Sequence, residues 1–272
     1  MSEIIDDHTA RARVAADIAR LTETFNGDTQ ISSVDLEWYE AIRANSRDTK
    51  RYSDGRTKEE VAVKLGVSAT QLSKLLRGQN VLDIGSGRGV FAADVAKDKS
   101  VHITALDYDA KVLADVPDKP NITPLQGDGY DLIGSGLSPE SFDSVFVTYS
   151  TNYWARSVEE LEKSISEPMK VLKPGGKIFY TPIAQNLSMT DAYLHGLIPT
   201  PSVEKVGHHK YHRAYGLLAI KAYQSIINLE EAGAVEVAFR ASNKNKQFPK
   251  KELADGRLVS LDSFSVVLTD GK

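Results

Sequence analysis

The chain has 272 residues and 41% hydrophobic content, which is enough for one α/β domain with a helical addition. Its net charge of -4 argues against a global basic field for nucleic acid, and the absence of cysteine excludes disulfides, thiolate zinc sites and a cysteine nucleophile. No apolar run reaches the length of a membrane span and no charged-then-apolar leader is present, so we expect a cytoplasmic protein without membrane contact.

The first part of the chain, residues 1–79, shows helical patterns and predicts an N-terminal cap or lid. From Asp6 to Phe25, apolar residues recur at steps of three and four, which is typical of an amphipathic helix packed on a main domain. Asp6 or Asp7 is placed to cap this helix. A second helix is predicted from Val34 to about Ala44, and its adjacent aromatics Trp38 and Tyr39 belong either to the core or to a lid over a ligand.

Residues 57–78 carry the pattern of two short helices joined at Gly66. The second helix would bury Leu72, Leu75 and Leu76. The segment resembles the helix-turn-helix core of phage-repressor-type DNA-binding domains. Those domains continue with further helices, whereas here a strand pattern begins two residues after Gly78. We therefore expect a helical hairpin that covers the main domain, and the alternative is DNA binding through a basic recognition helix at residues 69–77.

The stretch Asn80–Gly89, NVLDIGSGRG, changes from an apolar run to three glycines at alternate positions, and a helical pattern follows. The apolar run is typical of a strand buried on both faces. Residues without a Cβ allow the main chain to approach a ligand, and the first N–H groups of the next helix point to the same place. The stretch predicts a strand, a glycine turn and a helix around a nucleotide-like ligand.

The spacing of the glycines distinguishes between cofactors. The dinucleotide pattern G-x-G-x-x-G and the P-loop pattern are both missing from this stretch. Instead, Asp83 stands two positions before the first glycine, where a carboxylate would repel a pyrophosphate but would suit an ammonium group. The stretch resembles motif I of the class I S-adenosylmethionine-dependent methyltransferases. Their cofactor has an amino acid end, an adenosine end and no phosphate.

Two further strand ends carry carboxylates. The strand predicted at 101–107 ends in Asp107, which can accept both hydroxyl protons of a ribose, in NAD as well as in S-adenosylmethionine. Tyr108 follows and is placed to lie against the adenine face. The strand predicted at 121–126 is followed by Gly127-Asp128, and an aspartate at this location in the resembling family accepts a hydrogen bond from the adenine amino group.

The fourth strand, predicted at 142–148, leads into a loop at 149–154 where the resemblance places the methyl group. The loop lacks the Asn-Pro-Pro-Tyr or Asp-Pro-Pro-Tyr pattern of family members that act on base amines or glutamine amides. Its aromatic residues Tyr149, Tyr153 and Trp154 are typical of a small-molecule pocket.

A helix is predicted from Val158 to Leu172, with a kink or a fresh start at Pro168. The motif Leu172-Lys-Pro-Gly-Gly then ends the helix before a fifth strand at 178–181. This motif is frequent in small-molecule methyltransferases, including those of quinone biosynthesis, and its residues are structural.

Residues 183–213 form a predicted long insertion, and loops of this length tend to be functional. His208 and His212 have the spacing of a metal pair, but no zincin glutamate follows, so no metal site is expected. We interpret the basic, aromatic cluster at 205–213 as a rim for an anionic substrate or as the source of a histidine base, with plain surface as the alternative. A helix at 217–232, two antiparallel strands at 235–239 and 263–269, and a basic loop at 243–257 complete the chain.

The resemblance covers residues 80–269 and implies a Rossmann-like α/β fold. The sheet is expected to have seven strands, mostly parallel, with an antiparallel last strand. We expect an N-terminal helical cap at 1–79 and a methyltransferase domain at 80–272. The resemblance further implies S-adenosyl-L-methionine as cofactor and methyl transfer to an oxygen or nitrogen of a small-molecule substrate. That substrate is expected to be anionic or aromatic; nucleic acid is not the expected partner, and a homo-oligomer is compatible with the sequence.

The expected cofactor-binding residues come from the turn and from the four strand ends: Asp83, Gly85, Ser86, Gly87, Gly89, Asp107, Tyr108, Asp128, Gly129, Thr148 and Tyr149. The candidates for a catalytic base are Tyr149, His208, His209 and His212. Competing functions are a nicotinamide oxidoreductase, which the glycine spacing and Asp83 disfavour, a DNA-binding regulator, and a catalytically silent S-adenosylmethionine binder.

Overall fold

The computed structural model describes residues 4–28, 30–37, 56–182, 205–242, 251–252, 258–259 and 263–271. The aromatic pair Trp38 and Tyr39, residues 183–204 of the predicted insertion and most of the basic loop predicted at 243–257 lie outside these residues. None of the described helices is both long and apolar enough to cross a membrane.

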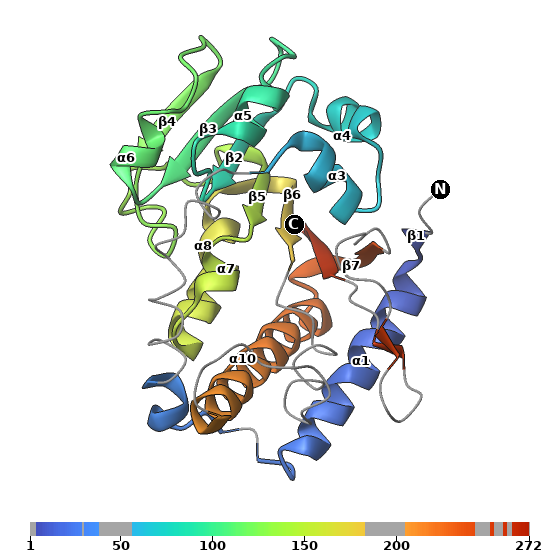
Figure 1. Ribbon diagram of the computed structural model, residues 1–272. Helices are drawn as coiled ribbons and strands as arrows, with labels where there is room; N and C mark the ends of the chain where they lie inside the picture. Colours follow the sequence, from blue (N-terminus) through green and yellow to red (C-terminus); the bar gives the residue numbers. More distant parts are fainter. Residues whose placement is uncertain are drawn as a thin grey trace.

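Eight of the described strands form one sheet in the order β1-β7-β10-β6-β5-β2-β3-β4 (Figure 1). The strands are β1 (Ile4–Ile5), β2 (Asn80–Ile84), β3 (His102–Asp107), β4 (Ile122–Gln126), β5 (Phe142–Thr148), β6 (Leu172–Thr181), β7 (Val235–Ser242) and β10 (Ser263–Asp270). Strands β2 to β6 are parallel, and β10 runs antiparallel to both β6 and β7. The predicted Rossmann-like fold with an antiparallel last strand is therefore confirmed.

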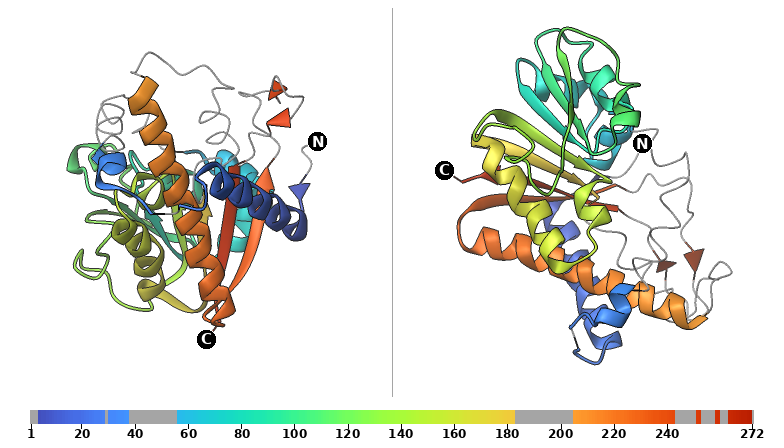
Figure 2. Two further views of the ribbon diagram at one scale, coloured as in Figure 1. Left: turned by 90° about the horizontal axis from the view of Figure 1, so that it is seen from below. Right: turned by 90° about the vertical axis from the view of Figure 1, so that its left-hand side faces the viewer.

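The described helices cover both faces of this sheet (Figure 2). They are α1 (Asp7–Thr24), α3 (Lys58–Lys64), α4 (Ala69–Leu76), α5 (Val90–Val95), α6 (Ala110–Leu113), α7 (Thr151–Trp154), α8 (Val158–Val171) and α10 (Lys205–Glu231). Because side chains alternate along a strand, Leu82 and Val145 pack toward α1, α8 and α10, whereas Val81 and Phe146 pack toward α3, α4 and α5. The central strands are thus buried on both faces, as their continuous apolar runs predict.

The predicted hairpin at 57–78 consists of α3 and α4, and each helix begins with a reciprocal capping box. Leu72 and Leu76 are buried in the same apolar cluster as Val81 of β2, whereas Leu75 is 38% exposed. The prediction that Leu75 is buried is wrong, because α4 contacts the domain along the single stripe of positions 72 and 76. The hairpin therefore shares a hydrophobic core with the sheet.

Helix α8 continues through Pro168 to Val171, so the predicted fresh start at Pro168 is wrong. A proline cannot donate to the carbonyl four residues earlier, which here belongs to Ser164. That carbonyl instead accepts a hydrogen bond of 3.0 Å from the hydroxyl of Tyr180, a buried residue of β6. Strand β6 therefore supplies the donor that the helix lacks. The same burial of Tyr180 raises the pKa of its hydroxyl.

The ends of several other elements differ from the sequence-based expectations. Helix α10 begins at Lys205, so residues 205–213 of the predicted insertion are helical. Strand β6 begins at Leu172, which pairs with Phe142 across a register shift, and the loop after β5 contains the short helix α7. Within the predicted basic loop, β8 (Lys251–Glu252) pairs with β9 (Leu258–Val259). The division into a cap at 1–79 and a domain at 80–272 stays a prediction.

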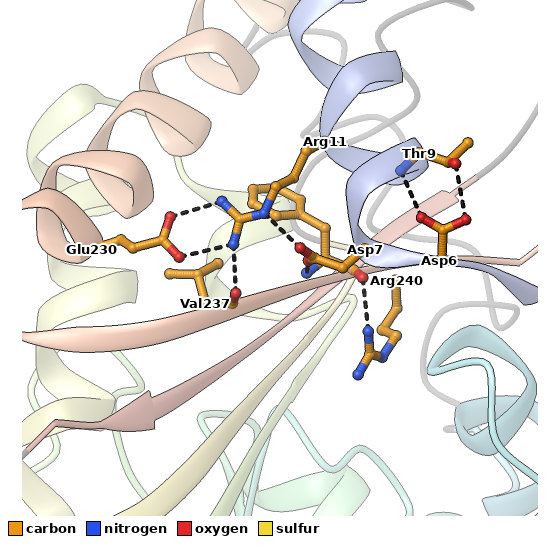
Figure 3. A network of polar contacts seen from close by, with 8 residues as sticks. Asp6, Asp7, Thr9, Arg11, Glu230, Val237 and Arg240 are labelled. Carbon is orange, nitrogen blue, oxygen red and sulfur yellow. Dashed lines mark hydrogen bonds and ion pairs between the residues drawn. The ribbon is translucent and has the colours of Figure 1, made fainter.

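The N-terminal helix α1 is joined to the sheet by an ion-pair network (Figure 3). Asp6 caps the helix by accepting a hydrogen bond of 2.9 Å from the main chain of Thr9, while Asp7 accepts one of 2.6 Å from the main chain of Phe239 in β7. The guanidinium of Arg11 donates to both carboxylate oxygens of Glu230 at 2.7 and 2.8 Å. It also donates to Asp7 at 2.8 Å, and these carboxylates raise the pKa of Arg11.

We expect Arg11→Met to lower the free energy of unfolding by about 1–3 kcal/mol, because hydrogen bonds between charged groups are lost and Glu230 keeps its charge. The measurement is urea denaturation in a double-mutant cycle with Glu230→Gln. Lys163→Met provides the control, because Lys163 forms an exposed ion pair with Glu159 that should contribute little. Equal losses for Arg11→Met and Lys163→Met would contradict the expectation.

Candidate functional site

A cavity of about 730 Å³ lies at the carboxyl ends of β2, β3, β4 and β5. Ten of the residues predicted to bind the cofactor line it: Asp83, Gly85, Ser86, Gly87, Asp107, Tyr108, Asp128, Gly129, Thr148 and Tyr149. Gly89 is not among the lining residues; it is the left-handed N-cap of α5 at φ 69°, and a Cβ there would lie 3.0 Å from Val116. The structure therefore assembles the predicted residues around one cavity and gives Gly89 a role in packing.

The glycine turn after β2 is closed by hydrogen bonds within the protein. The amides of Gly85 and Ser86 both donate to the carbonyl of Leu106, at 2.8 and 3.0 Å, and the amide of Gly89 donates to Ser86. The amide of Gly87 donates to the carboxylate of Asp107 at 2.9 Å. Because these N–H groups already have acceptors, they are not available as donors for a phosphate. Here the turn differs from the expectation that its amides face a ligand.

Two carboxylates lie at the ends of adjacent strands beside this turn. Asp83 is 3% exposed, and burial together with the charge of Asp107 raises its pKa to about 7. Burial also raises the pKa of Asp107, which is 8% exposed, but the amides of Asp109 and Gly87 each donate to one of its oxygens and oppose the shift. Both oxygens keep acceptor capacity for a further donor. The pair therefore favours a ligand that brings a positive charge and hydroxyl groups.

The loop after β4 forms another wall of the cavity. The Asp128 side chain accepts a hydrogen bond of 2.8 Å from the main chain of Tyr130, and the hydroxyl of Tyr130 donates to the carbonyl of Thr151 at 2.7 Å. A Cβ on Gly129 would lie 2.5 Å from a methyl group of Thr151, so only glycine fits there. Tyr108, at the end of β3, is 72% exposed on the rim. This wall is thus fixed next to an exposed aromatic ring.

Thr148, the last residue of β5, and Tyr149, which follows it, lie at the other side of the cavity. The two hydroxyls of Thr148 and Thr181 lie 3.5 Å apart. The amide of Tyr149 donates to the carbonyl of Thr181 at 2.9 Å, and its carbonyl accepts from the indole of Trp154 at 3.0 Å. Tyr149 has φ 50°, an uncommon value for a residue with a side chain. Its main chain is therefore held on both sides in a strained conformation at the site.

Two cations that the sequence does not assign to the site surround this tyrosine. The Nζ atom of Lys64 lies 2.6 Å from the hydroxyl oxygen of Tyr149, and the guanidinium carbon of Arg56 lies 4.6 Å from the centre of its ring. Lys64 belongs to α3 and Arg56 directly precedes that helix. No local motif marks either residue, since only the packing of the hairpin brings them here.

Two buried hydroxyl oxygens that line the cavity have no hydrogen-bond partner within the described part of the chain. They are Oγ of Ser86 and Oγ1 of Thr151. Buried polar atoms are nearly always hydrogen-bonded, so these atoms fit a polar ligand in the cavity. His208 and His209 lie in the first turns of α10, and their side chains lie outside the described part of the structure. The prediction that one of them is a base stays a prediction.

Comparisons with known proteins agree with this geometry. Residues 82–180 match the family model described as a methyltransferase domain. The chain is 32% identical over 102 residues to a demethylmenaquinone methyltransferase of Renibacterium salmoninarum, covering 37% of this chain and 40% of that protein. It is 37% identical over 112 residues to phosphoethanolamine N-methyltransferase 1 of Triticum aestivum, covering 38% of this chain and 21% of that protein.

A third relative is a ubiquinone/menaquinone biosynthesis C-methyltransferase of Brucella anthropi, 29% identical over 103 residues and covering 37% of this chain and 39% of that protein. The chain thus spans 40% or less of the lengths of these three relatives. The similarity to a methyltransferase domain thus falls on the parallel strands whose ends carry the cavity.

Proposed function

We propose that the protein is a methyltransferase that moves a methyl group from S-adenosylmethionine to a small-molecule substrate. The observation that carries the proposal is the pair of buried carboxylates, Asp83 and Asp107, at the ends of adjacent strands beside the glycine turn. In this proposal Asp107 accepts the ribose hydroxyls, Asp83 attracts the ammonium group, and Tyr108 and Asp128 contact the adenine. The orphan hydroxyls of Ser86 and Thr151 fit the same polar ligand.

The bound cofactor would supply an already activated methyl group on a sulfonium. The protein then has to hold the acceptor atom in line with that methyl group. Thr148 and Tyr149 lie at the end of β5, where an acceptor can face the cofactor, and the aromatic side chains around Tyr149 exclude water. The acceptor atom predicted from the sequence is oxygen or nitrogen. The relative named as a C-methyltransferase adds an activated carbon to these candidates.

Two observations support this proposal over a nicotinamide oxidoreductase. The amides of the glycine turn are consumed by Leu106 and Asp107, and a carboxylate at position 83 faces the place that a pyrophosphate would need. Titration calorimetry with S-adenosylhomocysteine and with NAD tests the choice. We expect binding of S-adenosylhomocysteine alone; binding of NAD alone would overturn the proposal.

The pKa of Asp83 gives the proposal a pH dependence. Its pKa of about 7 in the folded protein lies above its ordinary value, so between these values the folded form retains a proton. Stability should therefore fall as the pH rises toward 7 and then stay level. An ammonium group favours the ionised carboxylate, so binding should release a proton below pH 7.

We expect S-adenosylhomocysteine to bind about tenfold more weakly near pH 6 than near pH 8. Calorimetry in two buffers with different ionisation enthalpies measures the proton released on binding. In Asp83→Asn the pH dependence should disappear, with weak binding at both pH values. A pH dependence that persists in Asp83→Asn would assign the titration to another group.

A further inference from the structure

The cavity is divided by charge into two ends. The end at β2, β3 and β4 carries four carboxylates: Asp83, Asp107, Asp109 and Asp128. At the end near β5, Arg56 lines the cavity, and Lys64 of α3 contacts the hydroxyl of the lining residue Tyr149. The proposed cofactor would use the acidic end through its ammonium and hydroxyl groups. The cationic end then remains for the acceptor substrate.

Neither cation has a carboxylate partner within the described part of the chain, and Lys64 stands on a helix that is packed into the core. The apolar face of α3, formed by Val61, Ala62 and Leu65, is buried in the domain core, and α3 packs against α5, β7 and β10 (Figure 1). Arg156, another cation on the cavity wall, instead forms an ion pair with Glu160, to which its guanidinium Nε donates at 3.0 Å. The positive charge at this end is therefore concentrated around Tyr149.

The hydrogen bond between Lys64 and Tyr149 fixes the direction of the phenol hydrogen. A lysine ammonium has donors only, so the oxygen of Tyr149 accepts from Lys64 at 2.6 Å. The O–H hydrogen of Tyr149 is then available for a different acceptor. Two cations therefore lie against the Tyr149 ring beside β5, at 4.6 Å for Arg56 and 4.7 Å for Lys64 from its centre, next to one available O–H donor.

The surroundings of this place are aromatic. The rings of Tyr149 and Tyr153 lie 5.3 Å apart between centroids, and those of Tyr153 and Trp154 lie 5.4 Å apart. Trp154 also lines the cavity. Donors and cations next to aromatic rings suit a flat group that carries a negative oxygen.

We propose that Arg56, Lys64 and Tyr149 form an oxyanion subsite that selects an acceptor with an ionised hydroxyl conjugated to a ring, that is, a phenolate or an enolate. This inference rests on the proposed function. The Tyr149 hydroxyl acts as a hydrogen-bond donor to that oxygen, and Lys64 is the positioning residue that orients it. The subsite therefore replaces a general base, because it binds the acceptor in its deprotonated form.

The transfer step balances with this arrangement. The oxygen anion, or the ring carbon conjugated with it, forms a bond to the methyl carbon while the carbon–sulfur bond breaks and its electron pair stays on sulfur. If the carbon reacts, the ring then loses the proton from that carbon to solvent and regains aromaticity. In both cases the transfer itself joins an anion and a sulfonium to give neutral products, and in the carbon case the later loss of the ring proton regenerates the phenolate.

The test uses the full chain saturated with S-adenosylhomocysteine and the probe 4-nitrophenol, whose ionised form absorbs visible light. We expect the protein to bind the phenolate in preference to the neutral phenol, so that the apparent pKa of the probe falls on binding. Lys64→Met and Arg56→Gln should each weaken phenolate binding by about tenfold, since each removes a charge-assisted contact. Tyr149→Phe should also weaken phenolate binding, because it removes the hydroxyl that donates to the phenolate oxygen.

Three controls separate the outcomes. Lys74→Met removes an exposed lysine of α4 and should leave binding of the probe unchanged. The uncharged 4-nitroanisole should bind weakly and equally to all variants. The carboxylate 4-nitrobenzoate distinguishes a phenolate subsite from a general anion site.

Equal binding of phenol and anisole, or preferential binding of the benzoate, would overturn the inference. So would full phenolate affinity in both Lys64→Met and Arg56→Gln. If the parent protein does not bind S-adenosylhomocysteine, the proposed function fails; if it binds S-adenosylhomocysteine but not the phenolate, only the subsite fails.

Discussion

Replacing Asp107 with alanine is expected to weaken the binding of S-adenosylhomocysteine by about 100-fold or more, because two hydrogen bonds to a charged acceptor are lost. The variant also loses the link between the Asp107 carboxylate and the amide of Gly87, so the turn itself is expected to loosen. Titration calorimetry measures the affinity, and circular dichroism verifies the fold.

Asp107→Asn is the matched comparison, since it keeps the shape and one acceptor oxygen but removes the charge. We expect its affinity to lie between those of the parent and Asp107→Ala. Asp115→Ala removes an exposed carboxylate outside the cavity lining and should bind like the parent. If Asp107→Ala binds as tightly as Asp115→Ala, Asp107 does not hold the ribose.

The second large effect is expected at Gly85. An alanine there would place its Cβ 2.2 Å from the hydroxyl oxygen and 2.8 Å from the Cβ of the buried Ser150, in a backbone with φ 72°. Left-handed strain contributes about 1–2 kcal/mol and overpacking a further 1–3 kcal/mol, so Gly85→Ala should destabilise the protein by about 2–5 kcal/mol. Denaturation in urea measures the loss.

Gly78 offers a matched control, because it has φ 73° and no atom within 4 Å of the position of a Cβ. Gly78→Ala should therefore show the strain alone, about 1–2 kcal/mol. Adding Ser150→Gly to Gly85→Ala should restore part of the difference. Equal losses in Gly78→Ala and Gly85→Ala would mean that the loop after β5 yields to the extra atom.

The site residues that could be predicted from the sequence are those that lie at the end of a strand. Asp83, Asp107 and Asp128 follow or end apolar runs, and parallel strands bring such ends to one edge of the sheet. The same local logic predicts the helix over most of α1 and a cap at Asp6 or Asp7, of which Asp6 is the N-cap in the structure. These features depend on residues that are neighbours in the chain.

The parts that could not be predicted depend on contacts between distant residues. Lys64 reaches Tyr149 across 85 positions, and its own surroundings in the sequence are those of any exposed helical lysine. The hydroxyl of Tyr180 likewise donates to the carbonyl of Ser164, which has no helix donor because residue 168 is proline. Local rules for proline do not predict this contact. The start of α10 was missed because a basic cluster with a glycine was interpreted as a loop.

The contacts of α1 and β1 with β7 have a consequence for how this protein behaves at high concentration. The outer main-chain groups of β7 are occupied in turn: Arg11 donates to the carbonyl of Val237, Asp7 accepts from the amide of Phe239, and β1 pairs with Ala241 and Ser242. The opposite margin of the sheet, β4, contains Pro124, which cannot donate to a ladder. Both borders are thus poor templates for another chain, which guards the folded protein against sheet-to-sheet polymerisation.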